Sequence, residues 1–141
     1  MFVMSFLNIL IRSSFVSEFI NESKFWHTLL GYSLITDDGW CNHVEGGFPT
    51  NCKATSVLTQ SKCEELCTSQ TSCIGYSFIR FEGACYLHPS ISSCPPNFQL
   101  NDNLMKTYNY KTKKREVPHT ATSKNDLVAR PSAFSVCYGK N

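Results

Sequence analysis

Eight cysteines in a chain of 141 residues constrain the fold more than any other feature. The count is even and far above ordinary cytosolic use, which is typical of disulfide-bridged domains made in an oxidising compartment. A zinc site would instead need close C-x2-C pairs or histidines at ligand spacing. The sequence has no C-x2-C pair, and its histidines are scattered at His27, His43, His88 and His119. We therefore predict disulfides with no metal and no other cofactor, and keep as the alternative a reduced intracellular protein with a Cys/His metal site.

The overall composition excludes several classes of protein. Hydrophobic residues make up 42% and charged residues 17%, so the chain can form a packed core. No run of 18 apolar residues occurs, so we expect no transmembrane helix. A net charge of +2 argues against a dedicated nucleic-acid-binding protein. We also predict no enzyme, because the motifs G-x-S-x-G, G-x-G-x-x-G and H-E-x-x-H are missing and bridged cysteines leave no thiolate nucleophile.

Composition divides the sequence into three zones. Residues 1–30 form an apolar N-terminal segment, residues 31–112 hold seven of the eight cysteines, and residues 113–141 are predicted to be a basic flexible tail. The first eleven residues are similar to the apolar core of a secretory signal peptide, although no positive charge precedes them and Arg12 follows. Asn21 begins a glycosylation sequon, which makes it a candidate modification site.

The charge is split unevenly along the chain. Residues 1–102 carry five Lys/Arg and nine Asp/Glu, a net of −4, whereas residues 103–141 carry eight and two, a net of +6, which together give +2. The basic cluster at Lys111, Lys113, Lys114 and Arg115 could bind an acidic polysaccharide. A solvated tail without a ligand is the simpler interpretation, and we favour it.

The middle zone predicts one short helix. Ser61 and Glu64 fit a capping box, with Ser61 as the N-cap of a helix over residues 62–69. Cys63 and Cys67 then lie four residues apart on one helix face. Because a helix of about two turns is not stable alone, we expect these cysteines to attach it to a neighbouring element.

Strand patterns follow the helix. Residues 74–81 are rich in aromatic and β-branched residues, Glu82-Gly83 marks a turn, and residues 84–88 are predicted to be the returning strand. Further strands are expected over residues 32–36 and 105–111. This order predicts the α+β class: a small disulfide-rich domain with one short helix packed on an antiparallel sheet.

The pairing of the inner cysteines can be argued from geometry. Cys67 lies at the helix end and Cys73 opens the next strand, so a short return joins them. Cys63 lies one turn earlier and faces Cys85 on the second strand of the hairpin. We therefore prefer the nested bridges Cys63–Cys85 and Cys67–Cys73 to the crossed alternative of 63 with 73 and 67 with 85.

The outer cysteines are less constrained, since eight cysteines allow 105 pairings. A Cys41–Cys94 bridge would tie the front loop to the loop that follows the hairpin. Cys52–Cys137 is then predicted as the remaining pair.

The spacing of cysteines and aromatic residues over residues 63–87 resembles the PAN/apple domain family. The matching features are C-x3-C on the helix, a third cysteine six residues on, a Gly-aromatic strand at Gly75, and the triplet Cys85-Tyr86-Leu87. Gly39-Trp40-Cys41 looks like the opening cysteine of many relatives, so the resemblance covers about residues 36–112. It implies a helix cradled by an antiparallel sheet, with nested bridges, and extracellular recognition of proteins or carbohydrates. The family has no shared binding motif, so the resemblance assigns no binding residue.

The function expected from these features is extracellular recognition, as in cell adhesion, by a secreted or cell-surface module that binds a protein or a carbohydrate. Candidate ligand contacts are Arg80 with the neighbouring aromatic Tyr76, and Tyr86 with the nearby His88. The simpler interpretation, which we favour, is that these aromatic residues form the core face of the sheet and Arg80 its solvated edge.

Overall fold

The computed structural model describes residues 27, 31–100 and 106–141. The chain divides into two units, residues 1–31 and 32–141, and the elements below belong to the second. Apart from His27, the apolar N-terminal segment (residues 1–30) lies outside the described residues. The candidate glycosylation site Asn21 is among the residues that are not described.

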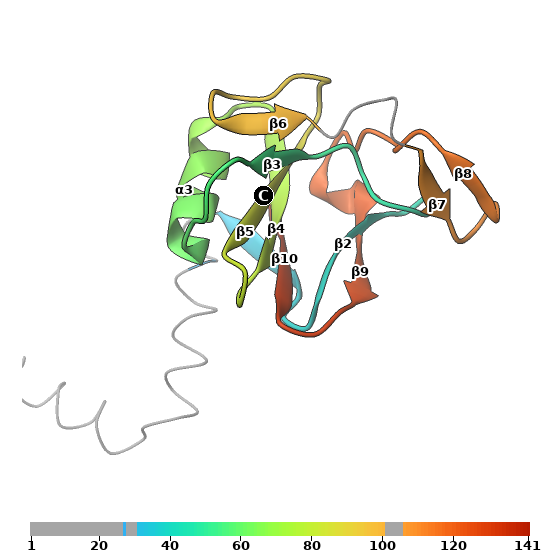
Figure 1. Cartoon of the computed structure of the whole chain (residues 1–141), viewed down its shortest axis with the longest axis horizontal. Helices are drawn as coiled ribbons and strands as arrows, with labels where there is room; N and C mark the ends of the chain where they lie inside the picture. Colours follow the sequence, from blue (N-terminus) through green and yellow to red (C-terminus); the bar gives the residue numbers. More distant parts are fainter. Residues whose placement is uncertain (1–26, 28–30, 101–105) are drawn as a thin grey trace, which may run out of the picture. The chain divides into compact units, whose positions relative to one another are not determined.

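One α-helix and ten strands make up the described part of the chain (Figure 1). The main sheet is antiparallel throughout, and the helix α3 (Gln60–Ser69) packs on it, which confirms the α+β class with one short helix on an antiparallel sheet. Its strand order is β1 (Tyr32–Thr36), β10 (Ser135–Lys140), β4 (Cys73–Ile79), β5 (Ala84–Pro89), β3 (Cys52–Ala54) and β6 (Phe98–Leu100). Two antiparallel pairs complete it: β2 (Gly39–His43) with β9 (Leu127–Pro131), and β7 (Thr107–Asn109) with β8 (Lys114–Glu116). The 3-10 turn η1 (Lys124–Asp126) precedes β9.

Helix α3 begins two residues earlier than the sequence predicted. Thr59, not Ser61, is the N-cap, and its hydroxyl accepts a hydrogen bond from the backbone N–H of Lys62 at 3.2 Å. Glu64 does not reach back to the helix start, because its side chain is buried against the sheet and accepts a hydrogen bond from the Tyr76 hydroxyl at 2.9 Å.

Among the described residues no helix has the length and apolar character needed to cross a bilayer.

Alternation along the strands gives the main sheet two different faces. Side chains of one set pack with the helix cysteines in the core, and these are Tyr76, Phe78, Cys85, Leu87, Val136 and Tyr138. The residues between them, such as Ser77, Tyr86 and Cys137, point to the opposite face because successive strand side chains alternate. That second face is covered by β2 and β9 and carries the pocket described below.

Residues 113–141 are not a flexible tail, which corrects the prediction from composition. Their last strand, β10, lies inside the main sheet and pairs with both β1 and β4. The Lys140 ammonium group donates hydrogen bonds to the carbonyl oxygens of Cys67 and Gln70, each at 3.0 Å, and so ties β10 to the end of the helix. Five of the six residues of β10 are buried. Both faces of this strand are covered, so the sequence lacks the alternation that marks a half-buried strand.

The basic cluster lies on an ordered hairpin. The strand expected over residues 105–111 is shorter, and β7 pairs with β8 instead of joining the main sheet. The turn is built around Asn109, whose buried side-chain oxygen accepts hydrogen bonds from the backbone N–H groups of Lys111 and Thr112. All four cluster residues are exposed on this turn and on β8, namely Lys111, Lys113, Lys114 and Arg115.

The inner disulfides have the predicted pairing. Cys63 bonds to Cys85 and Cys67 to Cys73, with Cα–Cα distances of 5.6 and 5.2 Å. The helix is therefore attached at two points to the β4–β5 hairpin, as its short length requires.

The outer disulfides differ from the prediction. Cys41 bonds to Cys137 and Cys52 bonds to Cys94, so the expected pairs Cys41–Cys94 and Cys52–Cys137 are wrong. The error follows from treating residues 113–141 as a tail. Because β10 is a central strand that contacts β2, it brings Cys137 to Cys41. Cys94, in the loop between β5 and β6, then bonds to Cys52 on β3.

Candidate functional site

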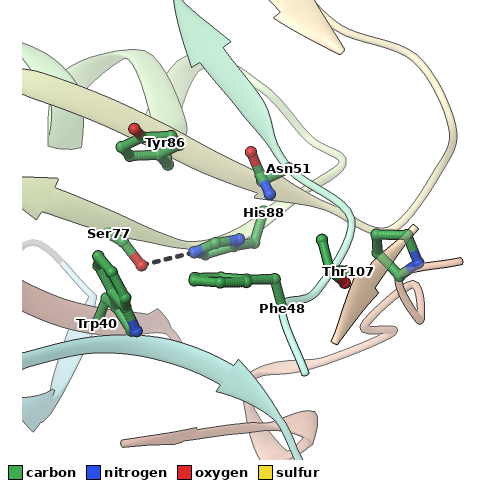
Figure 2. A pocket seen from close by; sticks show the side chains of 8 residues that line it. Trp40, Phe48, Asn51, Ser77, Tyr86, His88 and Thr107 are labelled. Atoms are coloured by element: carbon green, nitrogen blue, oxygen red, sulfur yellow. Dashed lines mark hydrogen bonds between the residues drawn. The ribbon is translucent and has the colours of Figure 1, made fainter. Parts of the chain in front are cut away.

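A pocket of about 240 Å³ opens on the face of the main sheet opposite the helix (Figure 2). Its walls come from four strands and the loops between them. The lining residues are Trp40 on β2, Ser77 on β4, Tyr86 and His88 on β5, Thr107 on β7, and the loop residues Phe48, Asn51 and Pro118. Most of this lining is aromatic or apolar, so the pocket is suited to a group that is itself largely apolar.

Ser77 and His88 form a hydrogen-bonded pair at the pocket. The distance from Ser77 Oγ to His88 Nε2 is 2.8 Å, and Figure 2 shows this contact as a dashed line. The backbone N–H of Cys41 donates to the same Ser77 oxygen at 2.9 Å. The serine oxygen has two lone pairs, so it can donate its proton to Nε2 in one imidazole tautomer or accept the Nε2 proton in the other.

His88 is a buried, uncharged imidazole at neutral pH. Its side chain is 2% exposed, and burial lowers the pKa of the imidazole to about 4, an effect that the backbone of Thr50 opposes only in part. The Thr50 backbone is therefore close to the imidazole, although no contact to Nδ1 meets standard hydrogen-bond geometry. The ring nitrogen Nε1 of Trp40 is also buried without a hydrogen bond among the described residues.

The aromatic walls are held by an arginine. Trp40 and Phe48 pack with ring centroids 5.1 Å apart, and the Arg130 guanidinium lies 5.9 and 5.5 Å from these two centroids. Arg130 faces Trp40 across the β2–β9 pair, donates a hydrogen bond to the Tyr110 hydroxyl, and lies 4.2 Å from the Tyr110 ring centroid. These contacts fix the orientation of the walls before any ligand arrives.

A second cation lies over the opposite wall. The Lys53 ammonium group is 5.6 Å from the centroid of the Tyr86 ring, and Lys53 is exposed. Lys53 and Arg130, the two cations that stack on aromatic residues of the pocket, are both at least partly exposed to solvent. The rim of the pocket is therefore positively charged.

Comparisons of the chain with protein-family models, with curated proteins and with solved structures gave no match. The chain is assigned to no family by these comparisons. The site is accordingly interpreted from its own residues.

Of the candidate ligand contacts named from the sequence, the pocket contains Tyr86 and His88 but not the other two. Tyr76 is fully buried beneath the helix, and burial raises the pKa of its hydroxyl well above the usual range. Arg80 is exposed at the end of the β4–β5 hairpin and donates a hydrogen bond to the Asp37 carbonyl oxygen at 2.9 Å. Sequence reasoning missed Trp40 and Phe48 as walls, and Trp40 drew attention only through the adjacent cysteine.

The metal site considered as an alternative finds no support in the residues that the structure describes. All eight cysteines are in disulfides, and no group of three His, Cys, Asp or Glu side chains there could hold a metal ion. The rings of His43 and His119 lie 5.2 Å apart, and burial together with this neighbour lowers the pKa of His43. His43 Nδ1 already accepts a hydrogen bond from the backbone N–H of Glu45 at 3.0 Å.

Proposed function

We propose that this chain is an extracellular, non-catalytic recognition module of the PAN/apple type, secreted or displayed at the cell surface, and that its ligand binds in the pocket opposite the helix. The observation that carries the proposal is the pocket itself: its aromatic walls are fixed by Arg130, and one of them, Trp40, has a buried ring N–H that forms no hydrogen bond within the described chain. Pockets of this kind, with few polar groups among aromatic walls, are typical of ligand sites.

The four disulfides support a location outside the cytosol. Such bridges persist in oxidising compartments and are reduced in the cytosol. Seven of the eight bridged cysteines are buried and Cys94 is partly buried, and loss of such a bridge typically costs about 2–5 kcal/mol of stability.

The Ser77–His88 pair supports binding rather than hydrolysis. A serine nucleophile needs a base that accepts its proton near neutral pH, oriented by a third group on the other ring nitrogen. The pKa of about 4 makes His88 a poor base, and no described residue is hydrogen-bonded to its Nδ1. The pair is therefore better suited to a fixed role in binding than to catalysis.

The proposal is tested by presenting the oxidised full chain to arrays of extracellular protein domains and of glycans. Thiol titration comes first: we expect almost no free thiol before reduction, whereas the intracellular alternative predicts that all eight cysteines react.

The arrays should then identify a ligand whose affinity falls about tenfold or more in Trp40→Ala, because loss of a central aromatic wall typically removes this much binding energy. The matched control Phe81→Ser, an exposed aromatic residue outside the pocket, should bind as the wild type does. A ligand that is indifferent to Trp40→Ala, or no ligand on either array, would contradict the proposal.

The basic hairpin is a second candidate surface, for an acidic polysaccharide, since its four cationic side chains are exposed on one ordered turn. On a heparin column we expect the double variant Lys114→Gln/Arg115→Gln to elute at clearly lower salt than the wild type. The control Lys62→Gln/Arg80→Gln removes the same charge from exposed residues outside the hairpin and the pocket, and should shift elution much less. Equal shifts for the two variants would mean that net charge alone, and not the hairpin, controls retention.

A further inference from the structure

Three cations of the basic hairpin form the only run of adjacent basic residues in the sequence. Lys113, Lys114 and Arg115 are followed by Glu116, whereas every other Lys or Arg of the chain stands between non-basic neighbours. Proteases that cut after paired basic residues recognise such a run with acidic groups in their own clefts. The sequence therefore presents one candidate bond to such an enzyme, the bond between Arg115 and Glu116.

The structure leaves this bond accessible. Lys113, Lys114 and Arg115 are exposed, and Glu116 is partly exposed. Residues 114–116 form β8, which is already extended and has β7 as its only neighbour among the described strands. Extended peptides bind to proteins by adding as a strand at a free edge, so the outer edge of β8 has the conformation that a protease cleft needs.

Little structure must open for the bond to reach a catalytic centre. The hairpin has only three cross-strand residue pairs and lies outside the main sheet, and a two-stranded hairpin has little stability of its own. One hydrogen bond from Asn109 Nδ2 to Glu116 Oε1 also crosses it, and the same oxygen lies 3.7 Å from His119 Nε2. Opening of β8 therefore costs far less free energy than unfolding of the domain.

Separate anchors hold the chain on the two sides of the bond. Before it, the buried Asn109 side chain donates a hydrogen bond to the Glu45 carbonyl oxygen at 3.0 Å. After it, the His119 carbonyl oxygen accepts a hydrogen bond from the Thr50 backbone N–H at 2.9 Å. The Thr50 and Thr120 hydroxyl groups form a further hydrogen bond at 3.0 Å. A cut between these anchors leaves both new ends attached to the domain.

The disulfides would keep the cut chain in one molecule. Three of the four bridges lie entirely before the bond, namely Cys52–Cys94, Cys63–Cys85 and Cys67–Cys73. The fourth, Cys41–Cys137, joins the two segments to each other, and β10 remains a central strand of the main sheet. Cleavage would thus give a two-chain protein with the fold of the intact one.

We propose that the Arg115–Glu116 bond is a processing site, where a protease specific for paired basic residues cuts the exported chain into two disulfide-linked segments. Water is the only co-reactant. The C–N bond between the two residues breaks, the hydroxyl group of water goes to the Arg115 carbonyl carbon, and its hydrogen goes to the Glu116 nitrogen. This inference rests on the proposed function, because proteases of this class act on exported proteins.

The test is digestion of the purified, oxidised full chain with kexin, an endoprotease specific for Lys-Arg pairs. We expect a single cut that creates a new N-terminus at Glu116. Without reduction the mass should increase only by that of one water molecule, and after reduction the two segments should separate. A cut at any other bond, or the absence of a cut, would overturn the proposal.

The rate of cleavage measures how much of the fold must open. A free peptide of residues 109–120 contains the same bond without the domain, and we expect the folded chain to be cut less than about a hundredfold more slowly than this peptide. Cleavage through global unfolding would be slowed about a thousandfold or more. Any slowing beyond about a hundredfold would overturn the proposal, because the hairpin would then not present the bond.

Matched variants assign the cut to the paired cations. Lys114→Gln/Arg115→Gln should be cut about a hundredfold or more slowly, because the acidic groups of the protease cleft are left unpaired. Lys62→Gln/Arg80→Gln removes the same charge from exposed residues elsewhere and should be cut at the wild-type rate. Equal rates for the two variants would rule out this site.

Export from living cells separates this inference from the proposed function. Behind a secretory leader, the wild type should appear in the medium as two disulfide-linked segments and Lys114→Gln/Arg115→Gln as one uncut chain. An uncut wild type in the medium would overturn the processing site and leave the recognition function in place. The recognition function has its own tests in thiol titration and the ligand arrays, so the two proposals can fail separately.

Discussion

Removing the Cys41–Cys137 bridge should lower the free energy of unfolding by about 4.7 kcal/mol, because it closes the longest loop of the four disulfides. These two cysteines are 96 residues apart in sequence, and both are fully buried. The bridge joins β2 to β10, so it fastens the β2–β9 pair to the centre of the main sheet. Urea denaturation of Cys41→Ala/Cys137→Ala against the wild type measures this loss.

The Cys67–Cys73 bridge provides the matched control, since it is also buried but closes a separation of only 6 residues. Chain entropy predicts a loss of about 2 kcal/mol for Cys67→Ala/Cys73→Ala. The long-loop variant should also exchange the backbone amides of β10 faster than the short-loop variant does. Equal losses of stability in the two variants would show that loop length does not determine what each bridge contributes.

Acidification from pH 6.5 to pH 4 should lower the free energy of unfolding by about 3 kcal/mol through His88 alone. The imidazole has an ordinary pKa of about 6.5 in the unfolded chain, while burial lowers the pKa in the folded protein to about 4. Between these values the unfolded state binds more protons than the folded state does. Stability is therefore fully present above pH 6.5 and is lost as the pH falls toward 4.

Urea denaturation at a series of pH values checks this expectation against two variants. His88→Gln should be less stable than the wild type near neutral pH, and the difference should narrow by about 3 kcal/mol on acidification because glutamine does not titrate. Phe81→Ser changes an exposed residue and no titratable group, so it should keep the wild-type dependence. Parallel curves for the wild type and His88→Gln would contradict the assignment of His88 as a buried neutral group.

The parts of the fold that were predictable depend on contacts close together in sequence. The C-x3-C spacing placed Cys63 and Cys67 on one helix face, and the aromatic run after Cys73 marked the hairpin that receives them. These bridges span 22 and 6 residues, so turn and helix geometry alone could restrict the partners. The N-cap was misplaced by two residues because both Thr59 and Ser61 can cap a helix, and only the packing of Glu64 decides between them.

The central strand β10 was missed for a physical reason. Val136 and Tyr138 point to the helix side while Cys137 points to the β2 side, and all three are buried. A strand covered on both faces shows no alternation of polar and apolar residues, and the surrounding lysines suggested a tail. The wrong pairing of the outer cysteines followed directly from this omission.

The pocket was not predictable from sequence because its walls come from distant segments. Trp40 and Phe48 precede Ser77 and His88 by about thirty to fifty residues, and no local pattern indicates that these segments meet. Tyr86 and His88 could be named because they share one face of a strand. The sequence does not show where β2 packs on the main sheet. That position is held by the Cys41–Cys137 bridge, which forms only when β2 and β10 meet in the folded chain.

The position of β10 between β1 and β4 determines the order in which a newly made chain can mature. Until residues 135–140 have been synthesised, β1 has no neighbour in the sheet and β4 is unpaired on the side where β10 will lie. Cys41 must therefore wait as a reduced thiol until residue 137 has followed it, whereas the cysteines of the helix and hairpin can oxidise earlier. If Cys41 bonds to another cysteine during that interval, thiol–disulfide exchange must break that bond before the bridge to Cys137 can form.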